Sequence, residues 1–228
     1  MAKRLCFVST PNEKSMFREV EVEFKYYSGF ALSQKRKNIA SMHQAIEDMG
    51  RGLNVLEIST KSPNPVGVAL SAFNLAYEDK ITGEKWPVEN VFQSSKVFEY
   101  GGPYRDLIRM HPKEAKRDER LRNSGKLTGF QFDGMEFALE PKTMFYDWVY
   151  MSALNSKKDI IEELIKYNAF TDIEFNHTKS INCQARAAAI FVSLYKLNSV
   201  DRVLKDMDEL KNLYVKPQNA SEQLHFPT

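Results

Sequence analysis

The sequence predicts an α+β fold that is mostly helical. Of its 228 residues, 43% are hydrophobic and 27% are charged, which is typical of a globular protein long enough to bury a core. Segments whose apolar residues recur every three or four positions outnumber those that alternate, and the alternating ones lie mainly in the first sixty residues. We therefore expect an N-terminal β-β-α-β extension over residues 1–62, packed on a larger domain over 63–215, with a flexible tail over 216–228.

The N-terminal extension is predicted from four short patterns. Residues 5–8 are apolar and suit a short strand, and residues 19–26 alternate charged with apolar side chains, which is typical of a half-buried strand. Residues 32–46 repeat apolar side chains at helical spacing. Residues 53–58 then predict another strand.

The rest of the chain is read mainly as helices. They are expected over residues 87–98, 111–122, 141–154, 159–166, 182–195 and 198–213. The helix over 141–154 is apolar on almost every side and should be central. The one over 111–122 is highly charged, which indicates either a solvated face or a surface facing phosphates. Residues 171–175 are expected to be extended.

Composition excludes several classes of protein. The 32 basic and 30 acidic residues leave a net charge of +2, so any contact with nucleic acid must be local. No apolar run approaches the roughly 18 residues of a membrane span, so no membrane contact is expected. Cys6 and Cys183 suggest free thiols in a reducing cytoplasm. The four histidines lack metal-ligand spacing and no phosphate-binding glycine loop occurs, so neither a metal nor a cofactor is predicted.

The segment Trp86–Phe98 is the first candidate for chemistry. On a helix that begins at Pro87, Glu89, Gln93 and Lys96 would share one stripe flanked by apolar residues. Such a stripe can be a structural salt bridge or amide link. Alternatively, a lysine kept partly neutral can form a Schiff base, and a buried carboxyl can act as a general acid.

Each of the other candidate site residues also has two interpretations. Asp172 and Glu174 form a second acidic pair or an exposed strand face. Arg186, within a helix of small residues, requires a partner carboxylate or a ligand anion. Four aromatic side chains belong either to the core or to a surface that stacks on bases: Phe73, Trp86, Tyr100 and Trp148. The basic run is solvated or binds nucleic acid, and it comprises Lys35, Arg36 and Lys37.

The segment Trp86–Lys96 resembles the signature of the NADAR superfamily, a Glu-x-x-x-Gln-x-x-Lys helix after a Trp/Tyr-Pro turn. Residues 70–73, 151–154 and 171–174 resemble further family motifs in the same order. Residues 29–35, 57–62 and 182–186 are similar to a longer branch, the NADAR-domain antitoxins encoded beside DarT-type DNA ADP-ribosyltransferase toxins. Ala72 stands where the compact family has Asn, and Asn74 is expected to take over that role.

The resemblance implies a NADAR-like compact core and an N-glycosidic hydrolase that removes ADP-ribose from guanine in DNA. Lys96 would be the nucleophile, Glu89 the acid/base and Gln93 the positioning group. The implied partners are ADP-ribosylated DNA and the cognate DarT-type toxin. The residues expected to contact substrate are Phe73, Asn74, Trp86, Tyr100, Trp148, Asp172, Glu174, Asn182, Gln184 and Arg186, and those expected to contact DNA are Lys35, Arg36 and Lys37.

Three alternatives stay open. In the first, water attacks the sugar directly and Lys96 acts only through its charge. In the second, the enzyme cleaves an N-glycoside of the riboflavin pathway, as other members of the superfamily do. In the third, the protein binds ADP-ribose or the toxin without turnover.

Overall fold

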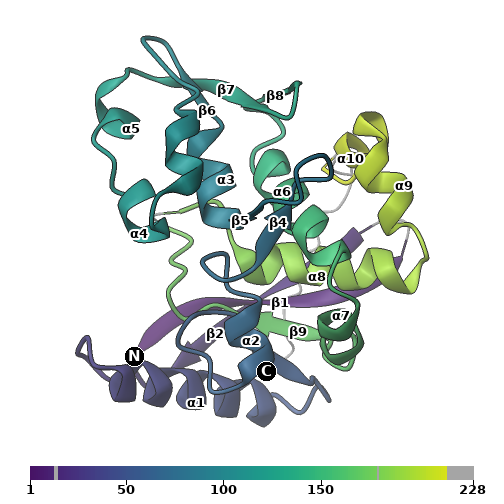
Figure 1. The fold of residues 1–228 in the computed structure, drawn as a ribbon. Helices are drawn as coiled ribbons and strands as arrows, with labels where there is room; N and C mark the ends of the chain where they lie inside the picture. Colours follow the sequence, from purple (N-terminus) through teal and green to yellow (C-terminus); the bar gives the residue numbers. More distant parts are fainter. Residues whose placement is uncertain (13–14, 179, 215–228) are drawn as a thin grey trace.

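The computed structural model describes residues 1–12, 15–178 and 180–214, and shows a mixed α/β fold (Figure 1). The tail predicted over 216–228 lies outside the described residues. Helices account for more of the described chain than strands do, but the fold is mixed and not mostly helical as the sequence predicted. No helix in this part of the chain is long and apolar enough to cross a lipid bilayer.

The largest sheet joins three strands from the N-terminal part of the chain with one strand from its C-terminal half. It contains β1 (Ala2–Asn12), β2 (Ser15–Phe24), β3 (Val55–Glu57) and β9 (Ala169–Thr171), in the order β2-β1-β9-β3. β9 runs antiparallel to β1 and parallel to β3. The predicted β-β-α-β order of the first sixty residues is present, but a strand from the C-terminal half lies between two of its strands. Asp172, which follows β9, is thereby brought next to the N-terminal residues of the sheet.

Helix α1 (Leu32–Asp48) covers one face of this sheet, and α8 (Gln184–Lys196) lies on the other (Figure 1). In β2, Val20, Val22 and Phe24 are buried and the glutamates between them are exposed, which confirms the predicted alternation. The buried strand residues pack with Ile39 and Met42 of α1.

The central helix is α6 (Met144–Asn155), and ten of its twelve residues are buried. It packs against α8 and α3, as its apolar surface predicts. The other described elements are α2 (Pro65–Ala69), β4 (Ala76–Glu78), β5 (Lys85–Pro87), α3 (Val88–Ser94), β6 (Lys96–Phe98), η1 (Arg105–Arg109), α4 (Pro112–Ala115), α5 (Arg120–Asn123), β7 (Leu127–Phe132), β8 (Met135–Ala138), α7 (Lys158–Leu164), α9 (Val200–Lys205) and α10 (Met207–Asn212).

The predicted helix over 87–98 is wrong in its second half. α3 ends at Ser94, and Lys96 begins β6, where it is opposite Phe130 of β7. The hydroxyls of Ser94 and Ser95 both donate to the carbonyl of Val91, so short polar side chains take up the backbone acceptor at the helix end. The chain is then free to pair with β7.

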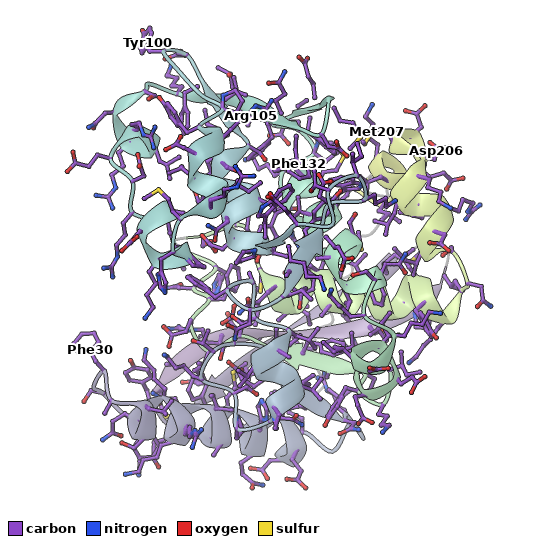
Figure 2. The ribbon with its side chains drawn as sticks, in the orientation of Figure 1. Phe30, Tyr100, Arg105, Phe132, Asp206 and Met207 are labelled. Atoms are coloured by element: carbon purple, nitrogen blue, oxygen red, sulfur yellow. The ribbon has the colours of Figure 1, made fainter. Side chains whose placement is uncertain are left out.

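Three other predicted elements are interrupted by aspartates, whose side chains also form hydrogen bonds with the backbone nearby. Asp118 accepts the N–H of Arg120 and separates α4 from α5, so the continuous helix over 111–122 was wrong. Asp206 caps α10, so the predicted helix over 198–213 is divided into α9 and α10. Figure 2 labels Asp206 and Met207 at this break. Asp172 accepts the N–H of Glu174, so the extended segment over 171–175 becomes a turn after Thr171.

The β7–β8 hairpin was not predicted. Its turn is Asp133-Gly134, with positive φ angles of 51° and 72°, between strands that carry Phe132 and Phe137. An Asp-Gly pair between two alternating apolar segments is a strong hairpin signal, and the sequence contains one at Asp133-Gly134, so this hairpin could have been predicted.

Candidate active site

A cavity of about 410 Å³ lies along α3, bounded by the segments that follow α2 and β9 and by the start of α8. It brings together eight of the residues predicted for the site, namely Phe73, Glu89, Gln93, Lys96, Asp172, Glu174, Asn182 and Gln184. These side chains come from regions more than a hundred residues apart in the sequence. Tertiary folding therefore assembles one site from motifs that are separate in sequence.

Glu89 and Gln93 form a buried pair on α3. Each residue is 5% exposed, and Gln93 Nε2 donates to Glu89 Oε1 at 2.8 Å. The backbone N–H of Glu89 donates to the carbonyl of Ala72 at 2.9 Å, which ties the helix to the segment that carries Phe73. A carboxylate in the first turn of a helix is favoured by the helix dipole. Gln93 Oε1 is buried and has no hydrogen-bond partner among the residues that the structure describes, so it is available to a ligand.

Lys96 enters the cavity from the start of β6. Its Nζ lies 4.8 Å from the ring centroid of Phe92, and it forms no salt bridge within the described part of the chain. Burial lowers the pKa of Lys96 to about 8, the attraction of Glu89 opposes this shift, and repulsion by Lys116 adds to it. An appreciable fraction of the amine is therefore neutral near pH 7.5.

Gly102 fixes the backbone beneath Lys96. Its φ is +80°, and a Cβ at this position would lie 2.3 Å from the carbonyl oxygen of Lys96. Only glycine combines this backbone conformation with this approach. The Gly101-Gly102-Pro103 segment thus supports the backbone of the nucleophile candidate.

Lys116 is a cavity residue that sequence reasoning missed. It follows α4, and its Nζ lies 3.4 Å from Glu89 Oε1 and 5.3 Å from the ring centroid of Phe73. Its side chain remains 54% exposed, so it lies at the mouth of the cavity. Periodicity could not identify it, because the packing of α4 on α3 brings the two segments together.

A second buried carboxylate, Glu57, lies behind Asp172. Glu57 accepts hydrogen bonds from Ser59 Oγ at 2.8 Å, Thr171 Oγ1 at 2.7 Å and the N–H of Ile173 at 2.9 Å. Burial raises the pKa of both carboxyls; repulsion from Glu57 adds to this shift for Asp172, whose pKa reaches about 8, and repulsion from Glu174 adds to it for Glu57. Because three donors stabilise the charged form of Glu57, Asp172 holds the proton of this pair at neutral pH.

His43 completes the network behind the cavity. Its Nε2 lies 2.8 Å from Thr171 Oγ1, and the Thr171 hydroxyl already donates to Glu57, so His43 must donate to Thr171. Burial lowers the pKa of His43 to about 4, which keeps the ring neutral. Neither His43 nor Glu57 was predicted as part of the site. A charged residue inside the apolar strand over 53–58 was the available signal for Glu57.

Gln184 connects the large sheet to the cavity wall. Its Nε2 donates to the carbonyl of Ile58 at 2.7 Å, and its Oε1 accepts the N–H of Ala72 at 2.8 Å. Both ends of the amide are therefore engaged by backbone. Gln184 orders the loop that precedes Phe73.

Five residues predicted to contact substrate do not line this cavity. Asn74 is exposed and donates to the carbonyl of Val68, and Trp86 borders a separate cavity of about 280 Å³. Tyr100 is 80% exposed at the outer edge of the molecule (Figure 2). Trp148 packs in the aromatic core and donates to the carbonyl of Leu204. Arg186 has a structural partner in the chain.

The partner of Arg186 is Asp147. Asp147 on α6 is fully buried, Arg186 Nη2 lies 2.8 Å from it, and the hydroxyls of Thr143 and Tyr214 also donate to this carboxylate. The arrangement satisfies the first of the two interpretations of Arg186. It links α6 to α8 inside the core.

The predicted DNA contacts on α1 lie beside the cavity. Lys35 Nζ forms a salt bridge of 2.9 Å with Glu174, which lines the cavity. Arg36 and Lys37 are exposed, and Lys37 Nζ lies 6.0 Å from the ring centroid of Tyr27. Only Lys35 of the three thus has a direct link to the site.

The site combines an amine of lowered pKa with a buried carboxylate and a free amide oxygen. Such groups can supply a nucleophile, a proton carrier and a hydrogen-bond acceptor in one enclosed space. Among residues 1–12, 15–178 and 180–214, no three His, Cys, Asp or Glu side chains are grouped so that they could hold a metal ion.

Comparison with known proteins identifies the family. A search of curated proteins found no match. The family model described as DarT1-associated NADAR antitoxin matches residues 2–224, and so includes the N-terminal extension. The match confirms the resemblance seen in the Glu89–Gln93–Lys96 signature, and the chain belongs to the family of DarT1-associated NADAR antitoxins.

Proposed function

We propose that this antitoxin removes ADP-ribose from guanine bases in DNA by hydrolysing the N-glycosidic bond. The observation that carries the proposal is a lysine with a pKa of about 8 in the same cavity as the buried Glu89–Gln93 pair. Membership of an antitoxin family associated with a DarT toxin supports the choice of substrate.

The first step opens the ribose ring. The guanine nitrogen and the ring oxygen are both bonded to C1 of the ribose. Glu89 gives a proton to the ring oxygen as its bond to C1 breaks, and the lone pair of the guanine nitrogen forms an iminium with C1. The neutral amine of Lys96 then adds to C1.

The second step releases the base. Glu89 carries a proton from the lysine nitrogen to the guanine nitrogen, the bond between C1 and guanine breaks, and its electrons stay with the restored base. The lysine lone pair forms a Schiff base with C1. Water adds to this carbon, Lys96 leaves as the amine, Glu89 regains its proton, and the sugar closes to free ADP-ribose.

The other cavity groups hold the substrate. Gln93 Oε1 accepts a hydrogen bond from the base or the sugar, because it is buried and no described residue of the protein donates to it. Protonated Asp172 can donate where an ionised carboxylate could only accept. Lys116 at the mouth neutralises the diphosphate.

The test uses an oligonucleotide that carries ADP-ribosylated guanine. The wild-type protein should restore unmodified DNA and release ADP-ribose, Lys96→Ala and Glu89→Ala should each lose this activity by roughly 100-fold or more, and Lys158→Ala should retain it. Lys158 is an exposed lysine on α7 outside the cavity. Binding of the substrate without restoration would instead support a recognition module.

Borohydride reduction separates the two chemical routes. If Lys96 forms a Schiff base, reduction during turnover should leave ADP-ribose attached to the peptide that contains Lys96. If water attacks an oxocarbenium-like centre directly, turnover should proceed without an adduct. An active enzyme with no adduct would overturn the covalent route.

A further inference from the structure

The segment from Arg105 to Lys126 concentrates positive charge beside the cavity. It contains eight basic and four acidic residues, whereas the rest of the chain has 24 basic and 26 acidic residues. The chain as a whole has a net charge of +2, so this segment accounts for its basic character. It includes η1, α4 and α5 and lies beside α3 (Figure 1).

The cations of this segment differ in whether the protein neutralises them. Arg109 pairs with Glu84, and Arg120 pairs with Asp106 and Asp118. In contrast, the exposed cations Lys113, Arg117, Arg122 and Lys126 take part in no salt bridge within the described part of the chain. Unpaired surface cations interact with polyanions without first losing an internal partner.

Lys116 connects this surface to the cavity. Lys113 precedes it by one helical turn and Arg117 follows it directly, while its own Nζ reaches Glu89. A polyanion lying over α4 and α5 would therefore run directly past the mouth of the cavity. An enzyme that acts on a base must receive that base out of the stack, with the strand held outside.

We propose that the surface formed by Lys113, Arg117 and Arg122 binds the DNA backbone and leads the modified strand past Lys116 into the cavity. This inference rests on the proposed function and names the surface that distinguishes DNA from a free nucleotide. It also assigns the main backbone contact to the α4–α5 region, because Lys35 on α1 is already paired with Glu174.

The first test measures binding of unmodified DNA and needs no turnover. The triple variant Lys113→Ala, Arg117→Ala, Arg122→Ala is compared with wild type and with Lys80→Ala, Lys158→Ala, Lys196→Ala, which changes the net charge equally at exposed lysines elsewhere. Fluorescence anisotropy at several salt concentrations should show the first variant losing affinity roughly tenfold or more, with a salt slope smaller by about two to three. The control should bind nearly as wild type does.

The second test measures turnover on two substrates. The α4–α5 variant should raise KM roughly tenfold for the modified oligonucleotide and leave both kcat and hydrolysis of ADP-ribosylated guanosine unchanged. If the protein binds DNA through the α4–α5 surface but does not hydrolyse the modified oligonucleotide, the DNA-binding surface is supported and the proposed function is overturned. If the protein hydrolyses the oligonucleotide and the α4–α5 variant has unchanged DNA affinity and KM, the proposed function is supported and the DNA-binding surface is overturned.

Two other outcomes would overturn the proposal that this surface binds DNA. One is loss of DNA binding in Arg36→Ala, Lys37→Ala while the α4–α5 variant binds normally, which would assign the backbone contact to α1. The other is loss of toxin binding in the α4–α5 variant with DNA binding intact, which would make this surface a protein interface.

Discussion

Replacing Lys116 with methionine should raise the pKa of Lys96. With a pKa of about 8, roughly a quarter of the Lys96 amines are neutral at pH 7.5, against about 0.1% for a lysine at the ordinary 10.5. Part of this lowering comes from the positive charge of Lys116. A unit charge several ångströms away near the surface is worth roughly 0.5–1 kcal/mol, so its removal should reduce the neutral fraction about two- to fivefold. Methionine retains the apolar stem against Phe73.

Competitive acetylation measures this change without any substrate. Trace acetic anhydride is added across a range of pH together with a small amine of known pKa, and labelling of the Lys96 peptide is quantified by mass spectrometry. The wild-type protein should reach half-maximal labelling near pH 8, and Lys116→Met at a higher pH. Lys113→Met removes the same charge from the same segment outside the cavity and should leave the Lys96 profile unchanged.

Two results would refute this reasoning. Half-maximal labelling of wild-type Lys96 near pH 10.5 would show that burial does not favour its neutral form. An equal shift in Lys116→Met and Lys113→Met would show that net charge, and not the position of Lys116 at the cavity, sets the reactivity. Glu89→Gln should shift the labelling profile in the opposite direction. Because Glu89 raises the pKa of Lys96, removal of its negative charge should move half-maximal labelling to lower pH.

Three further predictions concern the support of the site. Arg186→Met leaves the fully buried Asp147 without its cation and should cost roughly 3 kcal/mol or more in urea unfolding, whereas Lys196→Met on the same helix should cost little; equal stability of the two variants would contradict the structural role of Arg186. Gly102→Ala should displace Lys96 and slow its borohydride trapping, because the added Cβ meets the Lys96 carbonyl, and unchanged trapping would show that the backbone has room. Asp172 has a folded pKa of about 8, above its unfolded value, so its contribution to stability should fall as pH rises from about 4 to 8. Asp172→Asn should remove that slope between pH 5 and pH 8, and a slope equal to that of wild type would place the titrating proton elsewhere.

Sequence patterns identified the parts of the molecule whose information is local. The alternation around Val20, Val22 and Phe24 depends on neighbouring residues alone, and so does the apolar surface of α6. The predictions failed where a short polar side chain competed with the backbone, as Ser95, Asp118 and Asp206 do at the ends of helices. Hydrophobic periodicity does not include that competition.

The sequence by itself determined the family and the chemical groups of the site, because the Glu89–Gln93–Lys96 signature is a short contiguous pattern. Tertiary structure decided which other residues join them. The insertion of β9 between β1 and β3 brings Asp172 to the N-terminal Glu57, and the packing of α4 on α3 delivers Lys116 to Glu89. The packing of α8 on α6 turns Arg186 inward to Asp147, while Tyr100 stays exposed at the outer edge of the molecule. These outcomes depend on strand pairing and helix contacts between distant segments, whose geometry no local pattern encodes.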